Sequence, residues 1–181
     1  MRELVREALA QTQGGDPRQQ IVDLAVDIDE AGRSCLPDGH ANLSHSGDWA
    51  IAVHAHAPIG VDLERLRPRS DLLGLARQVC SPAQCEALGA LEGEARLQQF
   101  YRWWTLKEAW LKARGQGLDM GLMRTLEFAP CGADEESDSC VALLQRAGLM
   151  LSLHTQAIEP SSLPAVLADE AVAWEFFRSV S

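Results

Sequence analysis

The stretch IGVDLE, residues 59–64, places two carboxylates in an otherwise apolar segment, with one leucine between them. In a β-strand alternate side chains share a face, so Asp62 and Glu64 would project side by side while the apolar residues face the other way. One interpretation is a solvent-facing strand surface. The other is a pair of metal ligands, because neighbouring like charges repel unless a cation lies between them, and carboxylate oxygens suit Mg²⁺.

The bulk composition predicts a compact soluble protein. A chain of 181 residues with 46% hydrophobic residues can fill the core of one domain, or of two small halves that share a core. The N-terminal residues carry charges and resemble no signal peptide, and no later run is long enough to span a membrane, so we expect a cytoplasmic protein. The five cysteines include no C-x-x-C pair, which favours reduced thiols over a zinc site.

The charge balance argues against two classes of partner. A net charge of −10 does not suit binding to nucleic acid or to an anionic membrane, so neither is expected. An anionic ligand would need cations placed locally. The chain has 16 Lys and Arg residues, of which the only lysines are Lys107 and Lys112, both inside WWTLKEAWLKA. Lysine is a compact point charge suited to phosphate.

Periodicity and turn residues predict an α+β fold. Helices are expected over 2–11 and 70–79, from Ser81-Pro82 onward, and over about 94–114. Strands are expected over 21–29, 49–57, 59–64, 124–129, 141–145, 149–155 and 172–177, with an acidic solvated loop over 132–139. Helix followed by strands occurs twice, and RLRPRS resembles a connector, so two similar α+β halves packed together are expected.

The predicted helix over 94–114 carries an acidic residue on an apolar face. On a helical wheel Glu108 lies within an apolar stripe, with Lys107 and Lys112 on either side, and a second apolar face lies roughly opposite. Glu108 and Lys112 fit an ordinary i,i+4 ion pair. A carboxylate in such a stripe also fits a metal ligand, because burial is costly for a charge that is neither paired nor bound.

The segment NLSHSGD, residues 42–48, precedes the strand expected over 49–57. It fits a turn in which Ser44 and Ser46 make local backbone hydrogen bonds. It also fits a phosphate cradle, because hydroxyl, imidazole and exposed backbone N–H groups are all donors. A serine and a histidine adjacent in sequence are weak evidence for a hydrolase, since a catalytic triad is assembled in space.

Together NLSHSGDWAIAV, IGVDLE and WWTLKEAWLKARGQGL, in this order, resemble the 4′-phosphopantetheinyl transferases of the surfactin-synthetase-activating type, in the holo-acyl-carrier-protein synthase superfamily. The resemblance covers about residues 40 to 118. It implies two pseudo-symmetric α/β halves with antiparallel sheets, 1–69 and 70–181, a long central helix in the second half and an active site between the halves. The region before the first motif is shorter than is usual in the family.

By motif match, the resemblance implies that Asp62, Glu64 and Glu108 are ligands of Mg²⁺, which is held together with the pyrophosphate of coenzyme A. Glu108 is implied to be the general base as well. These roles suit phosphoryl transfer, which depends more on positioning and charge neutralisation than on covalent help.

The resemblance also implies a set of coenzyme A contacts. Lys112 would steady the pyrophosphate and the departing 3′,5′-ADP, and Lys107 would contact phosphates. Ser44 and His45 would contact the 3′-phosphate. Arg33 stands where the family usually has a lysine.

The implied activity is transfer of 4′-phosphopantetheine from coenzyme A to a serine of an apo acyl or peptidyl carrier protein. Carrier proteins of fatty-acid, polyketide and nonribosomal peptide biosynthesis all remain open as acceptors, and a monomer is expected. The alternative is a shortened, weakly active relative that acts as a binding module for coenzyme A or carrier protein.

Overall fold

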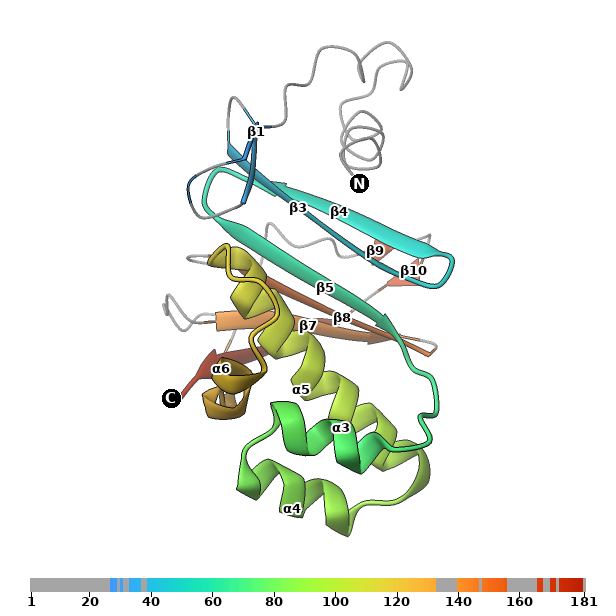
Figure 1. Ribbon diagram of the computed structural model, residues 1–181. Helices are drawn as coiled ribbons and strands as arrows, with labels where there is room; N and C mark the ends of the chain where they lie inside the picture. Colours follow the sequence, from blue (N-terminus) through green and yellow to red (C-terminus); the bar gives the residue numbers. More distant parts are fainter. Residues whose placement is uncertain are drawn as a thin grey trace.

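The computed structural model describes residues 27–28, 30, 33–36, 39–132, 140–146, 148–155, 166–167, 170–171 and 173–180. The helix predicted over 2–11, most of the strand predicted over 21–29 and all but the first residue of the acidic loop predicted over 132–139 lie outside these residues. The described chain mixes antiparallel sheets with helices, which confirms the predicted α+β class (Figure 1).

Two larger antiparallel sheets organise the described strands. The first has the order β1 (Asp27–Ile28), β2 (Ser34–Leu36), β3 (Gly39–Ser46), β4 (Trp49–Ala55). The second has the order β5 (Ile59–Arg65), β8 (Leu149–Thr155), β7 (Cys140–Arg146), β11 (Glu175–Ser179), β6 (Phe128–Cys131). A short pair is formed by β9 (Val166–Leu167) and β10 (Glu170–Ala171). Strand β5 is therefore an edge strand of the second sheet.

Four described helices follow β5 in the chain: α3 (Leu72–Val79), α4 (Pro82–Ala90), α5 (Gly93–Ala113) and α6 (Met120–Thr125). Side chains cap three of their N-termini. Asp71 accepts from Gly74 N, Asp119 accepts from Leu122 N, and Ser81 forms a capping box with Gln84 ahead of Pro82. The long helix predicted over 94–114 is confirmed as α5.

Helix α5 crosses one face of the second sheet, over β5 and β8 (Figure 1). Its core partners include Leu143 and Met150 on the sheet and residues of the other helices. The opposite sheet face carries Val61 and Leu63, which pack with Leu151 and with partly buried residues of β4. The predicted alternation along β5 is confirmed, because its apolar residues face the first sheet while its polar residues face α5.

Gly60 lets α5 approach β5 closely. A Cβ at this position would lie 2.1 Å from Ala109 O and 2.4 Å from Ala113 N, so any larger residue would push the helix away. The close approach brings the C-terminal half of α5 against the acidic residues of β5.

Two predicted elements differ from the structure. The turn predicted for NLSHSGD is confined to Gly47 and Asp48, because residues 39–46 form β3, which pairs along its length with β4. The strand predicted over 124–129 is present as β6 but begins later, at Phe128, because α6 extends to Thr125. In both places pairing partners that are distant in sequence determine the conformation.

The predicted division into halves 1–69 and 70–181 stays a prediction. Strand β5 precedes residue 69 in the chain, yet it pairs with β8 from Ile59↔Thr155 to Arg65↔Leu149. The second sheet thus takes one strand from before the connector and four from after it. Of the helices in the described part of the chain, none is long and apolar enough to cross a membrane.

Candidate active site at the junction of β3, β5 and α5

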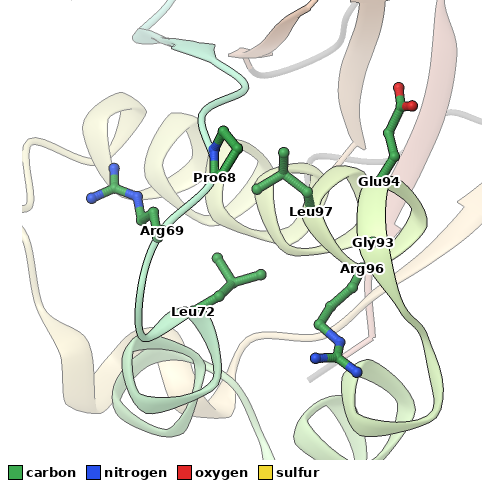
Figure 2. Close-up of a pocket in the computed structure, with 7 residues that line it drawn as sticks. All are labelled: Pro68, Arg69, Leu72, Gly93, Glu94, Arg96 and Leu97. Atoms are coloured by element: carbon green, nitrogen blue, oxygen red, sulfur yellow. The ribbon is translucent and has the colours of Figure 1, made fainter.

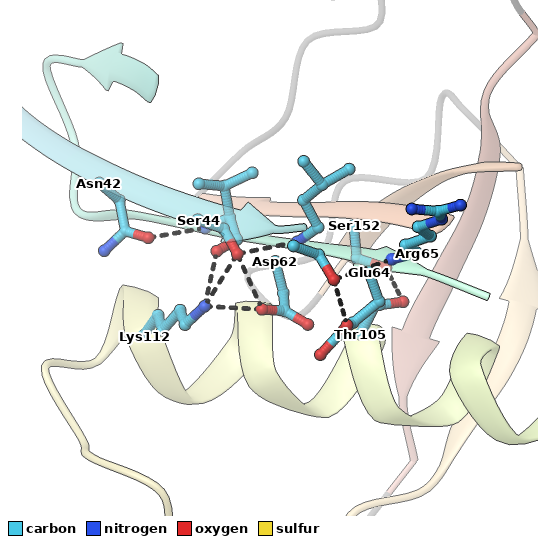
Figure 3. A network of polar contacts seen from close by, with 11 residues as sticks. Asn42, Ser44, Asp62, Glu64, Arg65, Thr105, Lys112 and Ser152 are labelled. Atoms are coloured by element: carbon cyan, nitrogen blue, oxygen red, sulfur yellow. Dashed lines mark hydrogen bonds and ion pairs between the residues drawn. The ribbon is translucent and has the colours of Figure 1, made fainter. Parts of the chain in front are cut away.

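Side chains of β3 accept hydrogen bonds from backbone N–H groups on the free edge of β5 (Figure 3). Asn42 Oδ1 accepts from Val61 N, Ser44 Oγ accepts from Leu63 N, and Ser46 Oγ accepts from Arg65 N, each at 3.0 Å. These residues alternate along β3 and their partners alternate along β5. The two sheets are thereby joined by a ladder of side chains, which supplies acceptors for three backbone N–H groups on the edge of β5.

Asp62 is buried where this ladder meets α5, with 4% of its surface exposed. Its Oδ1 accepts from Lys112 Nζ at 2.7 Å and from Ser44 Oγ at 3.1 Å. Burial raises the pKa of Asp62, although Lys112 and Ser44 act in the opposite direction. The solvent-facing interpretation of IGVDLE is therefore wrong for Asp62.

Glu64 and Glu108 lie near Asp62 and share its environment. Glu64 accepts from Ser46 Oγ at 2.8 Å, and burial, followed by the charge of Asp62, raises its pKa against the Ser46 hydrogen bond. Burial and the charges of Asp62 and Glu64 raise the pKa of Glu108 to about 6, against the effect of Lys112. The three predicted metal ligands, two on β5 and one on α5, thus interact with one another electrostatically.

These acidic residues fit a divalent cation in their chemistry. Asp62 Oδ2 is buried and accepts no hydrogen bond, although buried carboxylate oxygens are normally satisfied. Mutual repulsion helps to raise the pKa values of Glu64 and Glu108, and a cation between them would relieve it. Within the described residues, however, no three side chains of ligand type form a closed metal-binding group.

Lys112 is the cation of the site. Its ammonium contacts Val61 O at 3.1 Å and Ser44 Oγ at 3.4 Å in addition to Asp62, and 26% of its side chain is exposed. The i,i+4 interpretation predicted an ion pair with Glu108. Lys112 instead forms its ion pair with Asp62. The charge of Lys112 acts on Glu108 by opposing the rise in its pKa that burial causes.

Lys107 has a different environment from the predicted one. It is fully buried, and its ammonium donates to Val79 O at 2.8 Å and to Gln84 Oε1 at 2.7 Å. Burial lowers its pKa to about 8. The predicted contact with coenzyme A phosphates is inconsistent with this position, because the ammonium is enclosed between α5, the end of α3 and the start of α4.

Ser44 and His45 lie on opposite faces of β3. Ser44 is 6% exposed and its hydroxyl is occupied by Asp62, Leu63 N and Lys112, so the predicted contact with the 3′-phosphate would compete with three existing partners. His45 is exposed. Its predicted contact stays a prediction, and the two residues cannot form a common cradle from one strand face.

A basic pocket lies at the C-terminal end of α5. It has a volume of about 90 Å³ and is lined by Arg33, Pro58, Ala113, Arg114 and His154. Arg114 stacks on Trp110, with its guanidinium 3.5 Å from the ring centroid, and lies 3.0 Å from His154 Nε2. Two of the lining residues are arginines, a residue type that suits an oxyanion such as phosphate.

A second pocket, of about 510 Å³, lies at the opposite end of α5, between the connector and its first turn (Figure 2). Leu72 and Leu97 give it an apolar part, and Arg69, Glu94 and Arg96 give it charges. Arg69 donates to Tyr101 OH at 3.0 Å and also lowers the pKa of Glu64. Arg69 therefore connects the wall of this pocket to Tyr101 on α5 and acts on Glu64 through its charge.

Asn42 and Ser46 also belong to the site, although neither was predicted from the sequence to do so. The pattern that could have revealed them is the spacing of two residues in N-x-S-x-S, because side chains two residues apart lie on the same face of a strand. Ser152 was missed as well. It lies opposite Asp62 on β8 and donates to Thr105 Oγ1 on α5 at 2.8 Å, which ties the helix to the sheet close to the site.

Comparison with known proteins identifies the family. Residues 58–168 match the model of the 4′-phosphopantetheinyl transferase superfamily. The chain is 36% identical over 167 residues to 4′-phosphopantetheinyl transferase HetI of Nostoc sp., which covers 81% of this chain and 69% of that protein.

Two relatives from Bacillus subtilis match over shorter regions. A 4′-phosphopantetheinyl transferase is 33% identical over 122 residues, 66% of this chain and 52% of its own length. 4′-Phosphopantetheinyl transferase Sfp is 36% identical over 103 residues, 55% of this chain and 45% of its own length. The match thus spans about half the length of these two relatives. From the family model and the extent of these matches, the chain belongs to the 4′-phosphopantetheinyl transferase superfamily.

Proposed function

We propose that the protein transfers 4′-phosphopantetheine from coenzyme A to a serine of an apo carrier protein, with release of 3′,5′-ADP. The observation that carries the proposal is the set of three acidic residues from β5 and α5, with raised pKa values, beside the single ammonium of Lys112. Membership of the family supports the reaction class. Carrier proteins of fatty-acid, polyketide and peptide biosynthesis are all compatible with this proposal as acceptors.

Within this proposal Asp62, Glu64 and Glu108 hold Mg²⁺. The buried, unsatisfied Asp62 Oδ2 supports this role. When bound, Mg²⁺ would neutralise charge on the diphosphate and on the leaving phosphate oxygens. Lys112 adds a positive charge at the same place, and its partly exposed side chain leaves it able to contact a phosphate as well as Asp62.

Glu108 has the properties of a general base. A base works best when its pKa lies near the working pH, and the pKa of Glu108 is raised to about 6. At neutral pH the carboxylate is therefore available to take the proton from the acceptor serine as its oxygen attacks the phosphorus. The serine is a poor nucleophile without such a base.

The two pockets suggest how the substrates enter. The basic pocket of Arg33 and Arg114 lies beside Pro58, just before β5, and it provides the local positive charge that an anionic coenzyme needs in a chain of net charge −10. The second pocket, lined by Pro68 and Arg69, lies just after β5. In this proposal coenzyme A approaches from the first end and the carrier protein from the second, so that they meet over the acidic residues.

The test is to incubate the protein with coenzyme A, Mg²⁺ and a panel of apo carrier proteins and to weigh the carriers by mass spectrometry. A gain of one phosphopantetheine group on the carrier serine is expected, and it should vanish when the metal is removed by a chelator. If coenzyme A binds but no carrier in the panel gains mass, the binding-module alternative is favoured over the transferase.

A further inference from the structure

The ladder between β3 and β5 has a second feature beyond joining the sheets. Ser46 Oγ accepts from the backbone N–H of Arg65 at 3.0 Å and donates to the carboxylate of Glu64 at 2.8 Å. Ser44 Oγ accepts from Leu63 N at 3.0 Å and donates to Asp62 at 3.1 Å. The same arrangement therefore occurs twice, two residues apart: each hydroxyl binds the backbone of one β5 residue and the acid of the residue before it (Figure 3).

The arrangement restricts both carboxylates. A hydroxyl that accepts a backbone N–H has one proton to donate, and here that proton goes to an acid oxygen. Because the hydroxyl is held by the backbone of β5, the acid is held relative to its own strand. The buried positions of Ser44 and Ser46, 6% and 7% exposed, protect these bonds from competition by water.

From this geometry, and resting on the proposed function, we propose that Ser44 and Ser46 are positioning residues that aim the carboxylates of Asp62 and Glu64 at a divalent cation. Neither serine would contact the cation or the reacting atoms. Groups that hydrogen-bond to metal-binding side chains fix the orientation of those side chains, and loss of such partners typically weakens metal binding by about 10- to 100-fold.

Ser46 offers the cleaner test, because Ser44 also contacts Lys112. The Ser46→Ala variant removes the hydroxyl, whereas Ser46→Thr keeps it on a residue that suits a strand. Asn42→Ala is the matched control. Asn42 Oδ1 accepts from the backbone N–H of Val61 at 3.0 Å in the same ladder, and no carboxylate of the described residues is its hydrogen-bond partner. Both alanine variants remove a hydrogen bond between β3 and β5. Only Ser46→Ala also removes the hydrogen bond to the carboxylate of Glu64.

The measurement is the binding of Mn²⁺ alone to the full chain. Binding is monitored by electron paramagnetic resonance, as the loss of the signal of free Mn²⁺. We expect Ser46→Ala to bind about tenfold more weakly than wild type, while Ser46→Thr and Asn42→Ala bind as wild type. Thermal unfolding without metal should show similar losses of stability for the two alanine variants.

Two results would overturn the inference alone. One is wild-type affinity in Ser46→Ala, and the other is an equal loss of affinity in Asn42→Ala, which would trace the effect to loosened strands rather than to a released carboxylate. Absence of Mn²⁺ binding by the wild type would overturn the inference and the proposed metal site together, so the two failures are distinguishable.

Discussion

Lys112 Nζ lies 2.7 Å from Asp62 Oδ1, and this ion pair fastens α5 to β5 at the centre of the candidate site. Through Ser44, which contacts both residues, the pair also reaches β3. Three elements from separate parts of the chain therefore meet at one buried carboxylate, and the predictions below depend on that arrangement.

The two lysines of the chain should have separate roles. Lys112→Ala should lower phosphopantetheine transfer on the order of 100-fold, because it removes the ammonium that is paired with Asp62 at the centre of the site. Lys107→Met should instead cost about 1–3 kcal/mol of unfolding free energy, since Val79 O and Gln84 Oε1 lose a buried donor. Urea unfolding and the Michaelis constant for coenzyme A separate the two effects. A raised Michaelis constant in folded Lys107→Met would restore the phosphate role predicted from sequence.

The transfer rate should depend on pH through Glu108. Its folded pKa is about 6, so the base is protonated at lower pH and deprotonated at higher pH. At low coenzyme A and limiting Mg²⁺ the rate should therefore rise with pH up to about pH 6 and level off above it, and Mg²⁺ bound to the same carboxylate should move the rise to lower pH. Glu108→Gln should abolish this limb together with most of the activity. A wild-type profile without a rise in this range would show that another group is the base.

The same pKa predicts an effect on stability. The pKa of Glu108 is raised from an ordinary value of 4.5 to about 6, so the folded state holds its proton more tightly than the unfolded state does. Its contribution to stability is full below pH 4.5 and is lost as pH rises through about 6. In metal-free buffer Glu108→Gln should unfold about 2–4 °C above wild type at pH 7.5 and with little difference at pH 4. If Glu108→Gln and wild type had equal melting temperatures at both pH values, burial would not penalise this carboxylate.

Gly60 should be intolerant of a side chain. In Gly60→Ala the new Cβ would overlap Ala109 O, so α5 would have to move from β5 at a cost of about 3 kcal/mol or more. Gly89→Ala on α4 is the matched control, because no described residue outside its own helical turn lies within 4 Å of the added Cβ, and it should stabilise the protein by about 0.5–1 kcal/mol. Circular dichroism during urea unfolding measures both. Similar stability of the two variants would contradict the close approach of α5.

Local patterns were sufficient for the elements whose apolar spacing is regular. Strand β8 matches the predicted 149–155, and α5 lies within one residue of its predicted ends, because each has a core-facing pattern that its own residues determine. The end of β3, residues 42–46, was interpreted as part of a turn or of a phosphate cradle, since its serines, asparagine and histidine are common in turns. Its conformation comes from pairing with β4 and from the contacts of its polar side chains with β5.

The site was predictable in its residue types but not in all its contacts. The alternation in IGVDLE placed Asp62 and Glu64 on one face, and motif matching added Glu108. The burial of Lys107 could not be read from its helix, because its acceptors Val79 and Gln84 lie more than twenty residues earlier in the chain. The same holds for Ser44 and Ser46, whose partners are on another strand.

The most direct test of the metal site is the anomalous signal of Mn²⁺ in crystals grown with coenzyme A. We expect one peak bound by the carboxylates of Asp62, Glu64 and Glu108 and by the diphosphate, and no peak in crystals of Asp62→Asn. A peak bound elsewhere, or a diphosphate held only by cationic side chains with Mn²⁺ absent from these acids, would contradict the proposed function.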